Sequence, residues 1–420
     1  MSHSKKNIPK RRFKKFSNIE SWEQLELGEV IEDQYNGQTP SRANDAFWKG
    51  NINWLSSGEL NKGIVTKTME KITEAGQDNA RLKIIPKGTF VLAITGLEAA
   101  GTRGNCGILG IDTALNQSCM ALFPNKKKLA ASFLFQWYLK IGEEYGIRYT
   151  QGTKQQSYNA ALIKILPIAL PSMGEQVVIA EFLDRLDNTI ALHQRKLEKI
   201  KALKTAYLSE MFPAEGETKP KRRFGGFTDD WEQRKLGEIA NSFEYGLNAS
   251  SKTYDGENKY IRITDIDESS HVFNQDNITS PDISLDNLNH YLLEEGDILL
   301  ARTGASTGKS YCYNKMDGKV FFAGFLIRAK IKQEYNVSFI FQSTLTERYN
   351  NFIQVTSQRS GQPGINAQEY ARFTLYIPKL KEQQKIGNFF KQFDNIITLH
   401  QRKLQKLQNI KKAYLNEMFI

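Results

Sequence analysis

The chain has 420 residues, and its 57 Lys and Arg against 46 Asp and Glu give a formal net charge of +11. Hydrophobic residues make up 40% and charged residues 25%, which is typical of a soluble globular protein of two or three domains. This excess of positive charge favours an anionic partner, nucleic acid before membrane. Three cysteines without a CxxC pair exclude a disulfide framework and disfavour structural zinc, so we expect a reducing, cytoplasmic location.

Neither a membrane span nor a secretory signal is expected. The most apolar stretch, residues 129–139, is too short to cross a bilayer. The N-terminal arm, residues 1–20, is basic, and no apolar core follows it. All Lys and Arg residues of this arm precede its first acidic residue, Glu20, and they predict a disordered tail that can contact phosphates.

Two long segments, residues 21–171 and 231–378, alternate short β-type runs with Gly, Asn and Ser turns. The runs predict strands at 89–95 in the first segment and at 259–264, 297–301 and 320–323 in the second. Apolar stretches that begin at Phe133 and Ser338 predict helices. Each segment has about 150 residues, enough for a hydrophobic core of its own. We therefore expect two mixed α/β domains.

A long helix is predicted after each of these segments, over residues 172–212 and 379–420. Seam residues recur at alternating spacings of four and three from Ile179 to Tyr207, and the second helix repeats this pattern. The spacing is the a/d seam of a coiled coil, here with one His and one Lys in it. Ser172 and Glu175 predict a capping box at the start of the first helix.

The two halves of the chain repeat one plan. Residues 187–212 and 394–419 align without a gap at an offset of 207, and 17 of these 26 positions are identical. Weaker matches continue upstream, with Glu175-Gln176 and Glu382-Gln383 at the same offset and Pro9-Lys-Arg-Arg-Phe13 and Pro220-Lys-Arg-Arg-Phe224 at the larger offset of 211. The helices are therefore nearly identical copies, whereas the domains between them have diverged.

The seam of each helix has two possible packing partners, its own domain or the other long helix. The period of 3.5, present at the same positions in both copies, favours a coiled coil. If a twofold pseudo-symmetry axis relates the two similar domains, the two helices run antiparallel. The midpoints of the seams are His193 and His400. We therefore expect these imidazoles to lie close together, with at least one of them neutral at pH 7.

Catalytic motifs are absent or incomplete. The sequence has no Pro-Pro dipeptide, which excludes the Asn-Pro-Pro-Tyr type motif of an amino-methyltransferase. Residues 304–310 resemble a phosphate loop but are one residue short, because position 303 is Thr where the leading Gly is needed. Pro281-Asp282 followed by Asp317-x-Lys319 loosely fits a nuclease pattern, but such short patterns occur by chance. The histidines form no HExxH motif. We expect neither a catalytic site nor a metal site in this chain.

Two pairs of equivalent loops combine basic and amide side chains with glycines. One pair lies at residues 151–158 and 357–362, and the other begins at Thr95 and Arg302. Arg pairs with guanine and Gln or Asn with adenine in the major groove, whereas Lys, Ser and Thr hold phosphates. A solvated turn is the alternative for any single residue, but the paired occurrence in a basic chain favours DNA contact. The candidate DNA-binding residues are Arg103, Lys154, Gln155, Gln156, Arg302, Thr303, Lys309, Arg359 and Gln362.

These features resemble the specificity subunits of type I restriction-modification enzymes. The resemblance rests on the repeated order of a variable domain, a Glu-Gln pair and a long helix that ends near Tyr-Leu-x-Glu-Met-Phe, here over residues 175–212 and 382–419. The Trp22-Glu-Gln and Leu27-Gly-Glu openings of the first domain are also similar to the family. The resemblance covers nearly the whole chain.

The resemblance implies an α+β fold. Two similar mixed α/β globular target-recognition domains are separated by two long helices that form an antiparallel coiled coil, with pseudo-twofold symmetry. The expected parts are a basic N-terminal arm (1–20), target-recognition domain 1 (21–171), a central conserved helix (172–212), a linker (213–230), target-recognition domain 2 (231–378) and a C-terminal conserved helix (379–420). The seam over residues 179–207 is about 44 Å long, and from this length we expect the helices to set a spacer of about 13 base pairs.

The resemblance also implies partners. Each domain contacts one half of a split site in double-stranded DNA, and the conserved helices bind two modification (methyltransferase) subunits. Restriction/translocase subunits complete the complex. S-adenosylmethionine, ATP and Mg are expected in these partner subunits, and no cofactor is expected in this chain.

Two other functions stay open at this point. One is a self-contained nuclease or methylating enzyme with a diverged site, which needs an acidic metal cluster or a cofactor loop. The other is a stand-alone DNA-binding regulator. A regulator is expected to be stable alone, whereas a specificity subunit is expected to be poorly soluble without partners, because its helix surfaces are uncovered.

Overall fold

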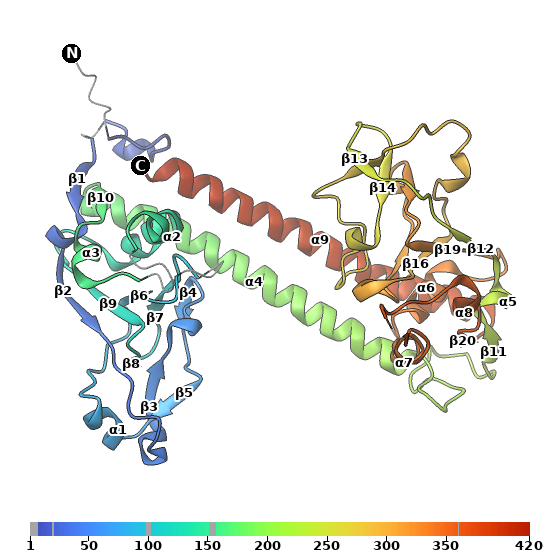
Figure 1. Ribbon diagram of the computed structural model, residues 1–420, viewed down its shortest axis with the longest axis horizontal. Helices are drawn as coiled ribbons and strands as arrows, with labels where there is room; N and C mark the ends of the chain where they lie inside the picture. Colours follow the sequence, from blue (N-terminus) through green and yellow to red (C-terminus); the bar gives the residue numbers. More distant parts are fainter. Residues whose placement is uncertain (1–6, 19–20, 98–101, 151–156, 360) are drawn as a thin grey trace. The chain divides into compact units, whose positions relative to one another are not determined.

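The computed structural model describes residues 7–18, 21–97, 102–150, 157–359 and 361–420 (Figure 1). The chain divides into two compact units. Unit 1 contains Met1–Leu192 and Gln405–Ile420, and unit 2 contains His193–Leu404. Helices α4 (Met173–Met211) and α9 (Leu380–Met418), each of 39 residues, contribute to both units.

Unit 1 is built on a five-stranded sheet with the order β2-β9-β6-β7-β4. Adjacent strands in this sheet run antiparallel, except β4 and β7, which run parallel. Every residue of the central strand β6 is buried, and helix α2 packs on β6 and β7. The elements are β2 (Ile31–Asn36), β4 (Gly63–Val65), β6 (Phe90–Ala93), β7 (Cys106–Leu109), β9 (Cys119–Pro124) and α2 (Ala131–Arg148).

Smaller elements complete unit 1. A three-stranded sheet has the order β5-β3-β8, and β1 pairs with β10 in antiparallel register. The elements are β1 (Glu23–Glu26), β3 (Trp48–Leu55), β5 (Glu70–Ile72), α1 (Glu74–Asn79), β8 (Ala114–Leu115), α3 (Ala160–Lys164) and β10 (Pro167–Leu170). Figure 1 shows α1, β3 and β5 together at the end of this unit that lies away from β1 and β10.

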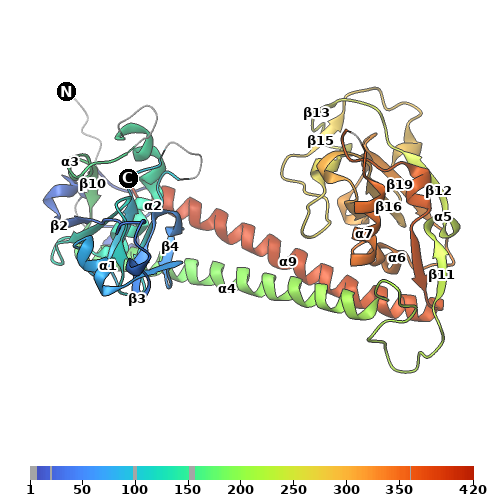
Figure 2. The same ribbon diagram turned by 60° about the horizontal axis from the view of Figure 1, so that its bottom comes forward.

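Unit 2 is built on a four-stranded antiparallel sheet with the order β12-β19-β16-β17, and α6 packs on β16 and β17 (Figure 2). Two-stranded sheets pair β11 with β20, β13 with β15, and β14 with β18. The strands are β11 (Glu232–Lys235), β12 (Ala240–Tyr245), β13 (Ser251–Thr253), β14 (Lys259–Ile261), β15 (Thr279–Pro281), β16 (Asp297–Ala301), β17 (Ser310–Cys312), β18 (Val320–Phe322), β19 (Leu326–Ile331) and β20 (Thr374–Ile377). The short helices are α5 (Leu236–Ile239), α6 (Val337–Ser343), α7 (Glu347–Thr356) and α8 (Ala367–Ala371).

The strands and helices predicted in the domains are present, but three of the strands are shorter than predicted: 89–95 is reduced to Phe90–Ala93 and 320–323 to Val320–Phe322. The strand predicted at 259–264 ends at Ile261 as β14. It ends there because Arg262 and Asp265 form a capping box that turns the backbone into a 3-10 helix. Asn159 and Asn366 occupy matching positions of the repeat, at the offset of 207. Both are helix N-caps, since each side chain accepts a backbone N–H of the helix that follows.

The prediction of a disordered N-terminal tail is wrong for residues 7–18, which are docked on unit 1. The Arg12 guanidinium makes two hydrogen bonds of 2.7 Å to the Glu175 carboxylate in the first turn of α4. The Phe13 ring lies 5.7 Å from the Phe182 ring. A buried ion pair and an aromatic contact hold this segment, so Arg12 is not available to phosphates.

The same device recurs in unit 2, where Arg223 binds Glu382 at the start of α9 with hydrogen bonds of 2.8 and 2.6 Å. The glutamine that follows each glutamate is also buried and satisfied. Gln176 accepts from the Ala130 amide before α2, and Gln383 accepts from the Asn336 amide before α6. The repeated Glu-Gln pair therefore fastens each long helix to its domain. At Ser172 the hydroxyl accepts from the Glu175 amide at 3.4 Å, so the serine half of the predicted capping box is present. The reciprocal half is not, because the Glu175 carboxylate binds Arg12.

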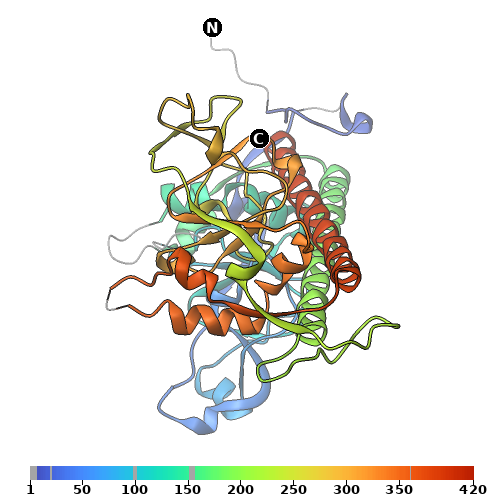
Figure 3. The ribbon, with the colours of Figure 1, turned by 90° about the vertical axis from the view of Figure 1, so that its right-hand side faces the viewer.

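The two long helices pair through their predicted seams in both units. In unit 1 the Phe182 and Tyr414 rings lie 4.8 Å apart, and Lys411 Nζ lies 2.5 Å from Asp187 Oδ1. Higher numbers on α4 therefore meet lower numbers on α9, which makes this pair antiparallel. Figure 3 shows α4 and α9 side by side.

In unit 2 the pairing has the same direction. Lys204 Nζ lies 2.7 Å from Asp394 Oδ1, and His193 Nδ1 lies 3.3 Å from His400 Nδ1. The predicted contact of the two imidazoles is confirmed. One ring must donate and the other accept, so the two rings cannot both be protonated without breaking this bond. Burial lowers the pKa of His193, and the nearby Lys403, His400 and Lys196 lower it further.

Candidate nucleic-acid interface

The two candidate loops of unit 2 lie against each other. Thr303 forms an antiparallel bridge with Gly364, and the Gly304 amide donates to the Pro363 carbonyl at 2.9 Å. The Ile365 amide donates to the Arg302 carbonyl at 2.9 Å. The structure therefore joins the segment after β16 to the segment after α7, and brings Arg302 and Thr303 close to the loop that carries Gln362.

Unit 1 closes its loops in the same way. Thr95 forms an antiparallel bridge with Ser157, and the Tyr158 amide donates to the Ile94 carbonyl at 2.8 Å. Thr95 and Ser157 correspond to Thr303 and Gly364 in the repeat. Three of the candidate residues, Lys154, Gln155 and Gln156, lie outside the described residues. The shared bridge shows that the loops which the sequence matched between the two copies also meet within each domain.

The cationic side chains of the first unit 2 loop are supported by neighbouring groups. The Arg302 guanidinium carbon lies 4.8 Å from the centre of the Tyr245 ring, a cation–π geometry. Lys309 Nζ lies 3.7 Å from a Glu268 carboxylate oxygen. Because that glutamate side chain is 86% exposed, this ion pair is weak and an incoming phosphate can replace it.

Arg359 and Gln362 differ in how far they are engaged. Arg359 binds Glu369 at 2.5 Å and donates to the carbonyls of Thr356 and Gln358. The Asn366 amide, followed by Arg359, lowers the pKa of Glu369 and keeps this carboxylate charged. Gln362 is exposed. Three of the five N–H donors of Arg359 are therefore used within the domain, and Nε–H and one Nη2 hydrogen remain for a DNA contact.

Arg103 is placed differently from the other candidates. It is half-buried in a turn and packs on Gly146 of α2, where an added Cβ would lie 3.0 Å from the Arg103 Cβ. The position equivalent to Arg302 in unit 1 is Ile94, which is buried. The structure supports this equivalence. The Ile94 amide donates to the Ser118 carbonyl, and the Arg302 amide donates to the carbonyl of Phe325, which occupies the position of Ser118 in the second copy. The two domains thus carry different side chains on the same frame.

Sequence reasoning missed the residues that support the candidates, among them Tyr245, Glu268 and Glu369. Glu369 lies beside the Asn366 cap, whereas no motif of the sequence marked Glu268. Tyr245 directly precedes Gly246, the partner of Gly37 in the repeat. That glycine match was the one sequence signal that could have pointed to this strand end.

The segment that resembles a phosphate loop does not have the geometry of one. Gly304–Ser306 form a single 3-10 turn, and strand β17 begins at Ser310 where a phosphate loop would continue into a helix. In the described part of the chain, no group of three or more His, Cys, Asp or Glu side chains is arranged to hold a metal ion. No helix among the same residues is long and apolar enough to cross a membrane.

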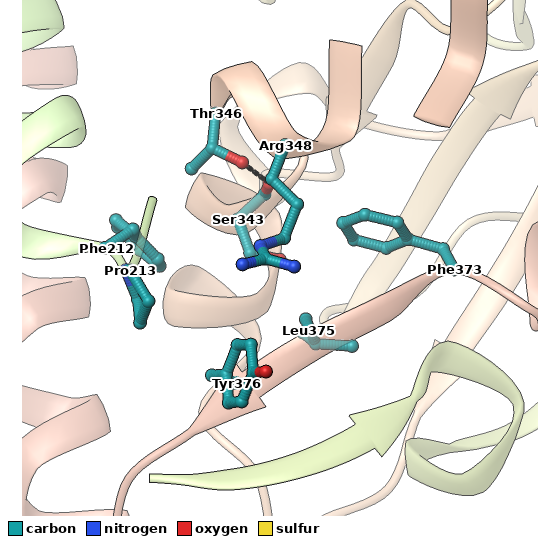
Figure 4. Close-up of a pocket in the computed structure, with 8 residues that line it drawn as sticks. All are labelled: Phe212, Pro213, Ser343, Thr346, Arg348, Phe373, Leu375 and Tyr376. Carbon is teal, nitrogen blue, oxygen red and sulfur yellow. Dashed lines mark hydrogen bonds between the residues drawn. The ribbon is translucent and has the colours of Figure 1, made fainter. Parts of the chain in front are cut away.

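The enclosed pocket at the end of α4 is too small for a ligand. Figure 4 shows Arg348 projecting between Pro213 and Tyr376, and the space has a volume of about 10 Å³, about one water molecule. The Arg348 guanidinium donates to the Ala214 carbonyl at 2.6 Å and lies 4.9 Å from the Tyr376 ring. These contacts attach the segment after α4 to its domain.

A repeated α+β domain with paired polar loops, fastened to long paired helices, defines a class of DNA-recognition proteins. The chain belongs to the family of the type I restriction modification DNA specificity domain, whose sequence model matches residues 19–202 and 228–409. It is a specificity subunit of a type I restriction-modification system. Such subunits are the non-catalytic, DNA-recognition members of these systems.

Individual relatives have low sequence identity over long stretches. The type I restriction enzyme MjaVIII specificity subunit of Methanocaldococcus jannaschii is 23% identical over 406 residues, covering 94% of this chain and 92% of that protein. The MjaIX specificity subunit of the same organism is 24% identical over 293 residues, covering 67% and 65%. The crystal structure of a type I restriction-modification S subunit from M. genitalium covers 98% of this chain and 99% of its own, with a TM-score of 0.68 and 17% identity, and it shares the fold.

Proposed function

We propose that each domain recognises one half of a bipartite, asymmetric site in double-stranded DNA. One observation carries this proposal. Both domains pair the same two strand-end positions, through the Thr95–Ser157 and Thr303–Gly364 bridges, yet the residue before the first of them is buried Ile94 in unit 1 and Arg302 in unit 2. A shared frame with different contact groups is what two unlike half-sites require.

The candidate residues divide by chemistry. Arg302, Arg359 and Gln362 in unit 2, with Gln155 and Gln156 in unit 1, have the side chains that pair with base edges. Thr303, Lys309 and Lys154 suit phosphate oxygens, and Arg103, packed on α2, can reach only a backbone that approaches that helix. Phosphate contacts position the duplex, and the base contacts carry the discrimination between sequences.

Two modification subunits are the proposed partners of α4 and α9. Apolar side chains on these helices are exposed in unit 2, where Leu203 is 48%, Ile396 43% and Leu399 64% accessible. Leu203 and Ile396 each precede a seam residue by one position, which puts them on the same flank of the antiparallel pair. An uncovered apolar flank beside a complete seam is suited to further helices.

We place the chemistry in the partners. S-adenosylmethionine would be bound by the modification subunits, and ATP and Mg by restriction/translocase subunits, with no cofactor in this chain. A complex that modifies chromosomal DNA with these metabolites works in the cytoplasm.

Methylome sequencing of the host with and without the gene tests the DNA proposal. We expect one methylated motif with two unlike specific parts and an unspecified spacer to disappear with the gene. A continuous motif or a perfect palindrome would contradict it. The chain alone should neither methylate nor cleave DNA.

Co-purification with the modification subunits tests the docking proposal. Leu203→Asp and Leu399→Asp should each reduce capture of the modification subunit at least tenfold. Val355→Asp, at an exposed apolar position on α7, is the matched control and should leave capture unchanged. Equal capture by all three variants would contradict the proposed docking surface.

A further inference from the structure

An open polar hollow lies in unit 1 beyond the carboxyl end of β2. It has a volume of about 490 Å³, and its lining comes from the end of β2, where the chain leaves the large sheet, and from the end of α1 (Figure 1). The lining residues are Tyr35, Asn36, Gln38, Thr39, Asn79, Ala80 and Arg81. None of the candidate DNA-binding residues discussed above lines this hollow.

The backbone on the β2 side is fixed. Gly37 sits so close to the Leu115 carbonyl that any Cβ there would overlap its oxygen. The Gln38 amide donates to the Leu115 carbonyl at 3.0 Å, and Trp54 Nε1 donates to the Gln38 carbonyl at 3.1 Å. These bonds use the backbone of Gln38 and leave its amide side chain exposed.

The α1 side holds Arg81 in a conformation that L residues seldom adopt. Its φ is +49°, at a helix end where Gly or Asn is the usual residue. At this position an arginine carries backbone strain that a glycine would avoid. Among the described residues, no hydrogen bond or ion pair engages the side chains of Asn36, Gln38 or Arg81.

The hollow combines the two kinds of group that discriminate base pairs. An arginine matches the acceptors of guanine, and amides match the donor and acceptor of adenine. Lys83 Nζ lies 5.4 Å from the Tyr35 ring at the rim, where it can meet a phosphate. We infer that this hollow receives base-pair edges of double-stranded DNA and sets specificity for the half-site of the first domain. The inference rests on the proposed function.

The equivalent position in the second domain is filled by a buried side chain. Gly246 takes the place of Gly37 and approaches the Ala323 carbonyl in the same way. Leu247 then stands where Gln38 stands, and it is buried against Tyr260 and Phe321. In unit 2, apolar side chains therefore fill the position that is polar and open in unit 1. The hollow therefore contributes to a difference between the two half-sites.

Methylome sequencing of a host that expresses the modification subunits with variants of this chain tests the inference. Arg81→Gly removes the side chain and suits the positive φ, so it should fold, and Gln38→Ala removes the amide. We expect each to relax discrimination by roughly tenfold in one half of the motif and to leave the other half unchanged. Lys126→Ala, an exposed residue of the same unit, is the control.

The outcomes separate the inference from the function on which it rests. If the wild-type chain directs no bipartite motif, the proposed function fails. If the wild-type motif is bipartite and both variants keep its full specificity, the hollow is not a recognition site. A loss shared equally by both halves also overturns the inference, because the hollow belongs to one domain only.

Discussion

The Arg302 side chain is positioned by its neighbours, while its hydrogen-bond donors remain available to DNA. Its backbone is fixed by bonds to Phe325 and Ile365, and its guanidinium lies over the face of Tyr245. A planar guanidinium stacked on an aromatic ring keeps its edge free for two parallel hydrogen bonds. The strand end thus supplies a rigid position, and the ring restricts the rotamers of the side chain.

Replacing Arg302 should affect one half of the DNA site. Arg302→Ala should cost about 1–3 kcal/mol of discrimination at one base pair, because a bidentate contact is lost. Arg302→Lys keeps the charge but not the fork, so it should restore affinity more than specificity. Competition binding with single-base variants of the site measures both. Uniform weakening across all sequences would assign Arg302 to phosphate contact instead.

The His193–His400 contact makes stability depend on pH. Folding lowers the pKa of His193, so the unfolded chain binds more protons at acid pH. The stability from the neutral ring is complete above about pH 6.5 and is lost as the pH falls from there through the lowered pKa. The thermal midpoint should therefore drop between pH 7.5 and 5.5 in the wild type by more than in a variant without the pair.

The double variant His193→Leu with His400→Leu tests this directly. It should raise stability by about 1 kcal/mol and flatten the acid side of the profile, at the expense of a defined helix register. His290→Gln, at an exposed histidine, is the control for titration elsewhere. If the double variant keeps the wild-type pH profile, the pair does not control it.

At the scale of elements, each long helix is fastened to its domain by a buried arginine–glutamate pair. Glu175 is fully buried and Arg12 is 7% exposed, whereas the neighbouring pair of Arg11 and Glu417 is 54% and 37% exposed. Arg12→Ala should destabilise unit 1 by about 3–5 kcal/mol, because a buried carboxylate loses its cation. Arg11→Ala, the matched control, should cost less than about 1 kcal/mol. Thermal unfolding measures the difference, and equal effects would refute the role of burial.

The helix seam also contains two equivalent ion pairs, Lys204 with Asp394 and Lys411 with Asp187. Each aspartate additionally accepts from a buried glutamine of its domain, Gln342 or Gln136. Lys204→Met and Asp394→Asn should each cost about 1–3 kcal/mol, and together less than their sum, because they share one interaction. Lys204→Met combined with Asp187→Asn should be additive. Urea unfolding of the four variants checks this pattern.

At the scale of the whole molecule, we expect the length of the two repeated helices to set the spacer between the two half-sites in DNA. One extra heptad in each helix, inserted after His193 and after His400, preserves the a/d register and adds about 10 Å. If the helices set the distance between half-sites, the methylated motif should gain about three base pairs of spacer. Seven residues added to the linker at 214–221 are the control and should leave the spacer unchanged. An unchanged spacer in the helix variant would refute the proposal that the helices set the distance between the half-sites.

The sequence by itself determined the duplicated architecture, the long helices and the meeting of their two histidines. Periodicity and repetition are properties along the chain, so a heptad pattern and an offset of 207 contain this information directly. The antiparallel direction required one added argument, the symmetry of two domains on one duplex. Contacts in both units agree with it.

Only the tertiary structure decided which polar residues work together. Arg12 looked like part of a free basic tail, and it is buried against Glu175, more than 160 residues away. The loops at Arg302 and Gly364 meet through one bridge, and Asn36, Gln38 and Arg81 form a hollow from segments without any shared motif. Charged and amide side chains have no period along a chain, and their partners depend on which strands the fold pairs and where each strand ends.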